Sequence, residues 1–369
     1  MTMNGILTIK RTILIRTLPY DEELDKFEII PLDELLQIDI LPFKMTKLVM
    51  LEVAYEGQRS SSYREASNEL SKKLGYQIST SLVRSVTIFV GNLVYQNDLT
   101  NALKTQVLIT NSIPFREKEK GELYILIDGA ALNTRIEDKN GSSWRENKLG
   151  MSFASINVVK RGSSDKSGHV IRKKEYTAFV GSANEFAKFV YLIAVNQSYG
   201  KYAQTIILGD GATWIRTMCE RLFPDAIQIL DLYHLKENIY DFAKHIFKNK
   251  KAKYKPWAVM MIDYIMDHKL DKVFLELEKY DNIKLPVGVV NLNNYLNNNR
   301  DKINYKDYKA KGYFIGSGAI ESANKTVLQR RLKQAGMRWS VETAQPILSL
   351  RAKVESGMWE HVKLLVMNL

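Results

Sequence analysis

Three acidic residues stand in segments of small residues, each where an apolar run or a turn ends. Asp128 follows Leu-Tyr-Ile-Leu-Ile and Asp210 follows Ile-Ile-Leu-Gly, and both precede Gly-Ala. Glu321 lies within Gly-Ser-Gly-Ala-Ile-Glu-Ser. Carboxylate oxygens are the ligands that hard cations such as Mg²⁺ prefer. If the fold brings the three carboxylates together, they could hold two Mg²⁺ or Mn²⁺ ions, and such a pair, about 3.5–4 Å apart, can break and join phosphodiester bonds.

A metal pair would also explain how three carboxylates can share one site. Without cations, acids at short range repel one another and some of their pKa values rise. Any one of these acids could instead be a helix cap or a surface residue. Glu321 is expected in the first turn of a helix, where the helix dipole favours negative charge. The three acids together, in this order, favour the metal site.

Asp231 and His234 lie three residues apart, where the last predicted strand passes into a helix. The chain has five His and one Cys and no second cluster of such residues, which disfavours zinc. We therefore expect a hydrogen-bonded pair that supports the acidic site or positions DNA.

The elements that must position these residues form one recognisable series. We predict strands at residues 123–127, 152–159 and 176–180, a helix at 184–196, a strand at 204–208, a helix at 214–222 and a strand at 227–230. Residues 160–174, rich in Lys, Arg, Gly and Ser, fit a hairpin loop between the second and third strands. Three adjacent strands followed by alternating helices and strands predict an α/β fold with a mixed sheet and flanking helices. The ribonuclease-H-like fold has this order of elements.

The rest of the chain suggests three parts. Residues 1–120 read as a helical N-terminal domain, 121–234 plus 313–369 as the ribonuclease-H-like catalytic domain, and 235–312 as an α-helical insertion. Within the insertion, the basic run 248–255 could be a solvated helix face or a clamp on a DNA backbone, and the polar segment 292–304 is expected to be a loop.

A helix-turn-helix is predicted near residues 60–92. Ser61 or Ser62 can cap its first helix in a capping box with Glu65, and Gly75 can end it. The second short helix would begin in a Ser/Thr-rich segment, and its side chains at Ser79, Thr80 and Arg84 would face the major groove or phosphates. The alternative is an ordinary helical hairpin whose polar start is only a cap.

Basic residues follow Glu321 on a helix expected from about residue 319 to 332. Next to a catalytic carboxylate they would suit a helix lying against phosphates. Trp339 could stack on a base, or it could pack beneath that helix. The residues predicted to contact DNA here are Lys325, Arg330, Arg331, Lys333, Arg338 and Trp339.

Composition limits the classes of protein. The net charge is +12, and residues 232–312 alone hold 16 Lys and Arg against 10 Asp and Glu, which favours a polyanionic partner such as DNA. Cys219 is the single cysteine, so an internal disulfide and a cysteine-rich zinc site are excluded. We find no apolar run of membrane-spanning length, no clear signal peptide and no glycine-rich nucleotide-binding loop. A cytoplasmic location is expected.

Four segments of the chain form a recognisable set: the residues around Asp128, Asp210-Gly-Ala-x-Trp214, Asp231-x-x-His234 and Gly316-Ser-Gly-Ala-Ile-Glu321-Ser. Together they resemble bacterial insertion-sequence transposases of the DDE type, in the group related to Mutator-like elements. The run that ends at Trp339-Ser resembles the segment after the Glu in that group. The likeness covers about residues 120–355 and is most specific in its last 40 or so; the N-terminal region is less recognisable. It implies a ribonuclease-H-like core, a helical insertion before the Glu, and Asp128, Asp210 and Glu321 as the catalytic, metal-binding triad. Asp231 and His234 match the group's Cys/Asp-x-x-His motif.

The resemblance further implies a Mg²⁺- or Mn²⁺-dependent enzyme of a mobile element, associated with the bacterial nucleoid. Its partner would be double-stranded DNA, as terminal inverted repeats and as target, and it would act as a homodimer or larger assembly on DNA. Two alternatives stay open: a non-catalytic DNA-binding regulator derived from such an element, and a nuclease on the same fold that cuts without joining.

Overall fold

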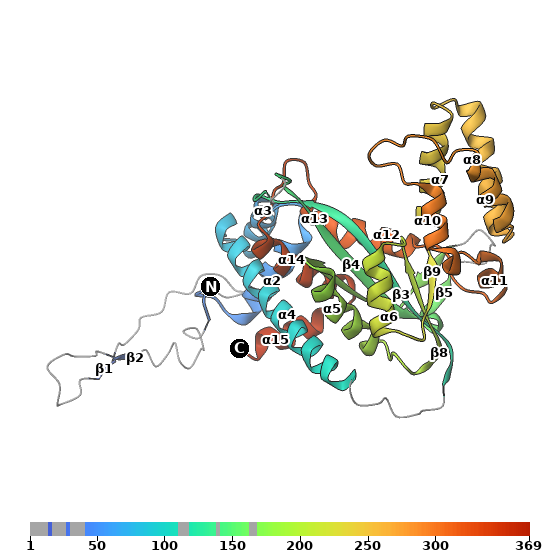
Figure 1. The fold of residues 1–369 in the computed structure, drawn as a ribbon. Coiled ribbons are helices and arrows are strands. Elements are labelled where there is room, and N and C mark those ends of the chain that lie inside the picture. Colours follow the sequence, from blue (N-terminus) through green and yellow to red (C-terminus); the bar gives the residue numbers. More distant parts are fainter. Residues whose placement is uncertain (1–13, 17–26, 30–40, 110–117, 138–140, 162–167) are drawn as a thin grey trace. The chain divides into compact units, whose positions relative to one another are not determined.

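The computed structural model describes residues 14–16, 27–29, 41–109, 118–137, 141–161 and 168–369. The chain divides into two compact units (Figure 1). Unit 1 contains Met1–Asp98, Asn133–Ser143 and Val327–Leu369, and unit 2 contains Leu99–Leu132 and Trp144–Thr326. No helix within these described stretches is long and apolar enough to cross a membrane.

Unit 2 is built on a five-stranded sheet. Its strands are β3 (Glu119–Asn133), β4 (Trp144–Ala154), β7 (Glu175–Val180), β8 (Tyr202–Gly209) and β9 (Ile227–Leu230). Their order across the sheet is β7-β4-β3-β8-β9, so the first strand along the chain is central. β4 and β7 are antiparallel, whereas β3 with β8 and β8 with β9 are parallel. The predicted α/β fold with a mixed sheet is therefore confirmed.

Two helices cover one face of this sheet. They are α5 (Ala183–Asn196) and α6 (Thr213–Leu222), which begin and end within one residue of the prediction. The missing side chain of Gly150 makes room for Phe186 and Val190 of α5, and Ile215 of α6 packs over Gly209. Residues one position along each strand, such as Met151 and Leu208, therefore face the opposite side.

Two predicted strand positions differ from the structure. β3 continues through Asn133, so Asp128 lies inside a strand instead of ending it. The strand predicted at 152–159 is β4 at Trp144–Ala154, and residues after it form a separate ribbon of β5 (Val158–Lys160) and β6 (His169–Ile171). This antiparallel ribbon is the hairpin expected between the second and third strands.

Between β9 and the segment carrying Glu321, the chain is helical. The helices are α7 (Leu232–Ile246), α8 (Lys251–Met266), α9 (Leu270–Glu278), α10 (Leu292–Asn298) and α11 (Tyr305–Ala310), with a short 3-10 turn at Arg300–Lys302. The predicted loop at 292–304 is wrong, because Asn291 caps α10 and Leu292 and Leu296 are buried. The rest of the predicted helical insertion matches this region.

Glu321 lies near the start of a helical stretch of changing geometry. α12 (Gly318–Ala323) passes into a π-helix at Asn324–Gln329 and then into α13 (Arg330–Leu332). The sequence predicted one continuous helix from about residue 319 to 332. π-helical turns inside α-helices are frequent at functional sites.

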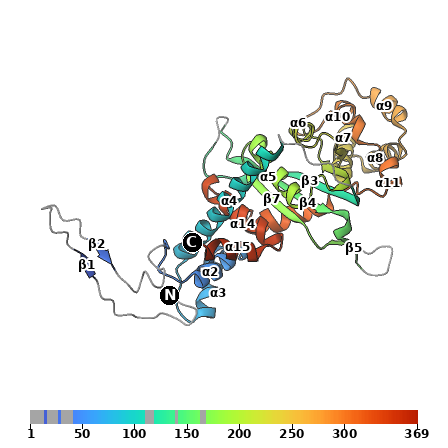
Figure 2. The same cartoon turned by 90° about the horizontal axis from the view of Figure 1, so that it is seen from below.

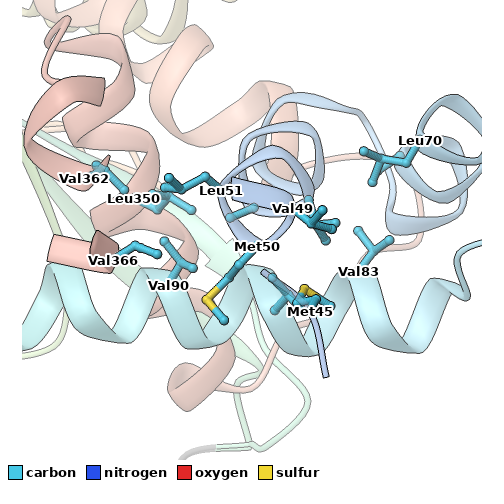
Figure 3. Packing of buried hydrophobic residues seen from close by; sticks show 14 of the residues in the cluster. Met45, Val49, Met50, Leu51, Leu70, Val83, Val90, Leu350, Val362 and Val366 are labelled. Carbon is cyan, nitrogen blue, oxygen red and sulfur yellow. The ribbon is translucent and has the colours of Figure 1, made fainter. Parts of the chain in front are cut away.

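Unit 1 has a core formed by both ends of the chain. α2 (Lys47–Arg59), α3 (Tyr63–Leu74) and α4 (Thr80–Ile109) precede the sheet, while α14 (Val341–Glu355) and α15 (Trp359–Met367) follow it. Figure 3 shows Leu350 and Val362 packed with Met50 and Val90 in one apolar cluster. In Figure 2, α14 and α15 lie beside α2, as their contacts require. A two-stranded sheet, β1 (Leu14–Arg16) with β2 (Phe27–Ile29), also belongs to this unit.

The domain limits differ from the prediction at the end of the chain. Residues 327–369 were assigned to the domain of the sheet, but they belong to unit 1. The physical reason is the apolar face of α14 and α15, whose Leu350, Val362 and Val366 complete the core of the N-terminal helices.

Candidate functional site

Strand register, extended by two residues, places Asp128 inside β3 level with Asp210 and Asp231, which directly follow the ends of β8 and β9. Every pair from Glu122↔Gln204 to Leu126↔Leu208 is offset by 82 residues, which is also the separation of Asp128 and Asp210. The pairs between β8 and β9, up to Gly209↔Leu230, are offset by 21, which is the separation of Asp210 and Asp231. The Asp231 N–H continues this ladder by donating to the Gly209 carbonyl at 2.8 Å.

Asp128 is 6% exposed, and its carboxylate accepts two hydrogen bonds and pairs with His234. Oδ1 accepts from the Gly129 N–H at 2.8 Å and lies 3.7 Å from Nε2 of His234. Oδ2 accepts a hydrogen bond from the side-chain amide of Asn324. The contact with Asn324 ties β3 to the helical stretch that carries Glu321.

Asp210 lies in a tight turn that requires the glycine after it. Its Oδ1 accepts from the Ala212 N–H at 2.9 Å, and Gly211 has φ +86°, a conformation that favours glycine. A Cβ on Gly211 would also come within 2.8 Å of Leu230 and 2.9 Å of Asn299. The hydroxyl of Tyr295 donates to the Asp210 carbonyl at 3.0 Å. Asp210 itself stays partly exposed.

Asp231 is fully buried, and backbone groups satisfy both of its oxygens. Oδ2 accepts from the His234 N–H at 3.1 Å and caps α7, while Oδ1 accepts from the Ser317 N–H at 2.6 Å. The Ser317 hydroxyl then donates to Oε1 of Glu321 at 3.2 Å. Asp231 therefore positions the segment that leads into Glu321.

Glu321 shares a helix face with Asn324. Residues three apart on a helix are neighbours, and Asn324 reaches Asp128. Asn324 is 6% exposed, and its Oδ1 has no hydrogen-bond partner. Glu321 itself is partly exposed, and the helical stretch that carries it is tied to Asp128 through the Asn324 amide.

His234 carries a positive charge at neutral pH. Pairing with Asp128 is the largest cause that raises its pKa from 6.5 to about 9, and the charges of Asp231 and Asp210 add to this against the opposing effect of burial. Its other ring nitrogen lies 3.7 Å from Glu237. The predicted link between Asp231 and His234 is therefore a backbone cap, and the imidazole serves Asp128 instead.

The donor atoms fit a hard cation better than a soft one. Carboxylates at Asp128, Asp210 and Glu321 and the partnerless Asn324 oxygen are all oxygen donors. In the described part of the chain, however, no three or more His, Cys, Asp and Glu side chains converge closely enough to hold an ion as they stand. The Asp128 carboxylate is already in contact with His234, Asn324 and the Gly129 N–H.

The predicted helix-turn-helix has the expected caps but a longer second helix. Ser62 caps α3 by accepting from the Glu65 N–H at 3.1 Å, and Gly75 ends it with φ +72°. Ser79 accepts from the Leu82 N–H at 3.2 Å at the start of α4, which runs for 30 residues instead of forming a short helix. Thr80 and Arg84 are exposed with Ser79 at this start.

Two of the predicted DNA contacts are corrected by their burial. Arg331 is 1% exposed; it donates to the Gly57 carbonyl at 3.1 Å and lies over the ring of Tyr63 at 4.2 Å. Trp339 is 8% exposed, packs against Arg331 at 5.3 Å and donates to the Leu332 carbonyl at 3.1 Å. Neither side chain is accessible to a nucleic acid. Of the two interpretations of Trp339, packing in the protein interior is the one that the structure supports. The other four predicted contacts on this stretch are exposed: Lys325, Arg330, Lys333 and Arg338.

Asn324 and Tyr295 are the site residues that sequence reasoning missed. A signal existed for Asn324, because it lies three residues after Glu321 and so on the same helix face. Tyr295 carried no signal, since it lies in the segment that was expected to be a loop.

Comparisons with known proteins place the chain in one family. A search of curated proteins found no match. Residues 1–365 match the family described as "Uncharacterised protein family (UPF0236)". Because the match spans almost the whole chain, the protein belongs to this family.

Proposed function

We propose that this protein is a DDE-type DNA transposase that cuts and joins DNA at a site formed by Asp128, Asp210 and Glu321. The proposal includes a ribonuclease-H-like catalytic core in unit 2. Numbered along the chain, the strands lie in the order third, second, first, fourth, fifth, with an antiparallel pair on one side and parallel neighbours on the other. This arrangement supports the core that the sequence resemblance implies.

One observation carries the proposal. Asp128 and Asp210 have the same offset as the paired residues of β3 and β8, so the extended register sets Asp128, inside β3, beside Asp210, which directly follows β8. Functional groups of open α/β sheets gather at this edge. Two links connect the Glu321 segment to the same edge. Ser317 hydrogen-bonds to both Glu321 and Asp231, and Asn324, a helix neighbour of Glu321, hydrogen-bonds to Asp128.

The residues have distinct roles in the proposed reaction. Asp128, Asp210 and Glu321 would hold divalent cations, which when bound would activate a water or a 3′-hydroxyl and stabilise the leaving oxygen. Asp231 fixes the approach of the Glu321 segment, and Asn324 and His234 orient the Asp128 carboxylate. Because His234 is protonated at neutral pH, it also offsets part of the negative charge of this edge.

DNA binding would use the exposed start of α4 and basic residues elsewhere. Ser79, Thr80 and Arg84 lie together on the first turns of this helix and are open to solvent. The N-terminal residues of a recognition helix are those that contact base edges in helix-turn-helix proteins. The basic run 248–255, at the start of α8, is largely exposed and can add phosphate contacts.

The test is cleavage of labelled DNA that carries the ends of the element encoding this chain, with Mg²⁺ or Mn²⁺. We expect metal-dependent nicking by the wild type and none by Asp210→Asn, with DNA binding by both. Asp225→Asn is the matched control, because Asp225 is an exposed turn residue of the same unit. Joined products would separate a transposase from a nuclease. Nicking that survives in Asp210→Asn would remove Asp210 from the site.

A second candidate, a non-catalytic DNA-binding regulator, is favoured by the state of Asp128. Its oxygens are already held by His234, Asn324 and the Gly129 N–H. A purely structural carboxylate would be held in the same way. Tight DNA binding by the wild type and by Asp210→Asn, with no cleavage by either in Mg²⁺ or Mn²⁺, would support this function instead.

A further inference from the structure

A pocket of about 650 Å³ lies on the face of the sheet opposite α5 and α6, within unit 2. Its floor is apolar and consists of Leu126, Leu208, Met151 and Phe153, all at most 2% exposed. Its size falls within the range of about 300–1,000 Å³ that is usual for sites of small organic groups. The floor alone would accept many apolar ligands.

The pocket adjoins the acidic edge of the sheet. Leu126 precedes Asp128 by two residues within β3, so both lie on the same face of that strand. Leu208 lies at the end of β8, two residues before Asp210. On the helical side, Ser322 lines the pocket and directly follows Glu321. A group seated here would therefore be next to whatever the acidic residues act on.

Cationic and aromatic side chains form the remaining walls. Arg161 and Lys174 line the pocket from the two ends of the β5–β6 ribbon, and Nζ of Lys174 lies 5.4 Å from the Tyr176 ring. Phe314 is partly exposed, and its ring centroid lies 6.4 Å from that of Phe153 and 5.9 Å from that of His169. An aromatic surface with nearby cations suits a planar base attached to a phosphate.

Two glycines keep the pocket open. Gly316 and Gly318 both line it, and a Cβ at either position would meet no atom within 4 Å. Neither has the positive φ that would explain a glycine by backbone conformation. Any larger side chain at these positions would project into open space along the pocket wall, so the glycines leave that space for another molecule.

We propose that this pocket holds one unpaired nucleotide of the bound DNA, with its base against Phe314 and the apolar floor and its phosphate near Arg161 and Lys174. The inference rests on the proposed function, because it assigns to the same site a DNA strand that is locally unpaired. Through this pocket the protein would distinguish an unpaired nucleotide from a paired one.

The test compares two DNA probes by fluorescence anisotropy, with the full chain and without divalent ions so that no cleavage occurs. One probe is a blunt duplex, and the other is the same duplex with a single unpaired 2-aminopurine nucleotide at a 3′ end. Stacking of one base predicts about tenfold tighter binding of the second probe by the wild type. 2-Aminopurine fluorescence should fall as the base stacks.

Gly318→Leu should fill the pocket and reduce the ratio of the two affinities to about one, while affinity for the blunt duplex is kept. Gly168→Leu is the matched control. Gly168 is an exposed glycine of the β5–β6 ribbon region, and a Cβ added there would also meet no atom within 4 Å. If Gly318→Leu does not fold, Phe314→Leu removes the ring and should also lower the ratio. Lys174→Ala should lower the ratio of the two affinities more than Lys173→Ala, since the exposed Lys173 does not line the pocket.

Failure of the pocket and failure of the proposed function look different. Binding of both probes with equal affinity by the wild type would overturn the pocket and leave the transposase proposal intact. A preference that survives in Gly318→Leu and Phe314→Leu would place the unpaired nucleotide elsewhere. A preference lost in these variants, in a protein that never cleaves DNA, would support the pocket and reject the catalytic proposal. No DNA binding at all would overturn both.

Discussion

A buried acid in unit 2 and a buried base in unit 1 are satisfied in complementary ways by backbone groups. In unit 2, Asp231 is fully buried and accepts hydrogen bonds from the backbone N–H groups of His234 and Ser317. In unit 1, Arg351 is 1% exposed and donates to the backbone carbonyls of Val327 and Gln58. Burial lowers its pKa to about 10, so it remains charged at neutral pH. Each buried charge joins segments that are distant in sequence.

The difference lies in what surrounds the buried charge. Asp231 stands beside Asp210 and is linked through Ser317 to Glu321, and both of these acids are partly exposed, as the proposed binding of ions requires. Arg351 has backbone carbonyls around it and pairs with Glu355 at 3.6 Å, and Arg331 has the Gly57 carbonyl and the Tyr63 ring. Exposure and unused bonding capacity, more than residue type, therefore separate candidate functional charges from structural ones.

The largest expected effect contrasts an acid in each unit. Glu321→Gln should lower the rate of DNA cleavage by about 10³-fold or more, because loss of one metal-binding carboxylate removes several kcal/mol of transition-state stabilisation. Glu342→Gln, at an exposed acid in the first turn of α14, should leave the rate unchanged. Single-turnover cleavage of labelled DNA measures both. Equal rates for the two variants would place Glu321 among the structural charges.

Asp231→Asn should destabilise the protein by about 3 kcal/mol. The amide NH₂ would face a backbone N–H, so one charged hydrogen bond is lost and a buried donor is left unmatched. Denaturant unfolding of the full chain gives the change, and Asp225→Asn should shift the midpoint very little because Asp225 is exposed. A small effect of Asp231→Asn would mean that the Ser317 segment is held by other contacts.

Adjacent arginines in α13 offer the matching experiment in unit 1. Arg331→Ala should lower the free energy of unfolding by about 3 kcal/mol, since a buried cation loses its carbonyl and its aromatic partners. Arg330→Ala should leave stability nearly unchanged because Arg330 is exposed. If Arg330 contacts phosphate, its loss should reduce the log–log salt slope of DNA binding by about 0.9. A reduced slope for a stably folded Arg331→Ala would contradict its structural role.

The arginine pair shows where the sequence was insufficient. Arg330 and Arg331 are neighbours in a basic segment, so charge alone treats them alike. The structure separates them because Arg331 lies on the helix face of the buried Val327 and Leu328. That periodicity was visible in the sequence, but the carbonyl of Gly57 and the ring of Tyr63, far away along the chain, were not.

Most of the sheet and its helices could be predicted, and the errors have physical causes. β9 was placed at its observed residues and β7 within one residue, because apolar runs define them. β4 was missed in part, since it contains the buried polar residues Asn147 and Lys148, and Lys148 depends on Glu146 and the Gly181 carbonyl. The register that aligns Asp128 with Asp210 depends on strand pairing, which the spacing alone does not specify.

The start of α4 tests whether exposure in unit 1 has a function comparable to that of the acids in unit 2. Arg84→Ala should reduce the log–log salt slope of DNA binding by about 0.9 for one lost phosphate contact. Lys104→Ala is the control, because Lys104 is an exposed cation further along the same helix. Fluorescence anisotropy at several salt concentrations gives the slopes. Equal slopes for the two variants would favour an ordinary helical hairpin.

The smallest effect concerns His234, whose charge depends on the acids around it. Its pKa of about 9 lies above the unfolded value of 6.5, so the stabilisation it provides is fully present below about pH 6.5 and is lost as the pH rises through about 9. His234→Gln should therefore be less stable than the wild type at pH 6, and the difference should disappear above pH 9. Denaturant unfolding across this range measures it, with a substitution at an exposed histidine, His268→Gln, as the control. A difference that persists unchanged at high pH would show that His234 acts by packing, and the acidic edge of unit 2 would then lack its protonated partner.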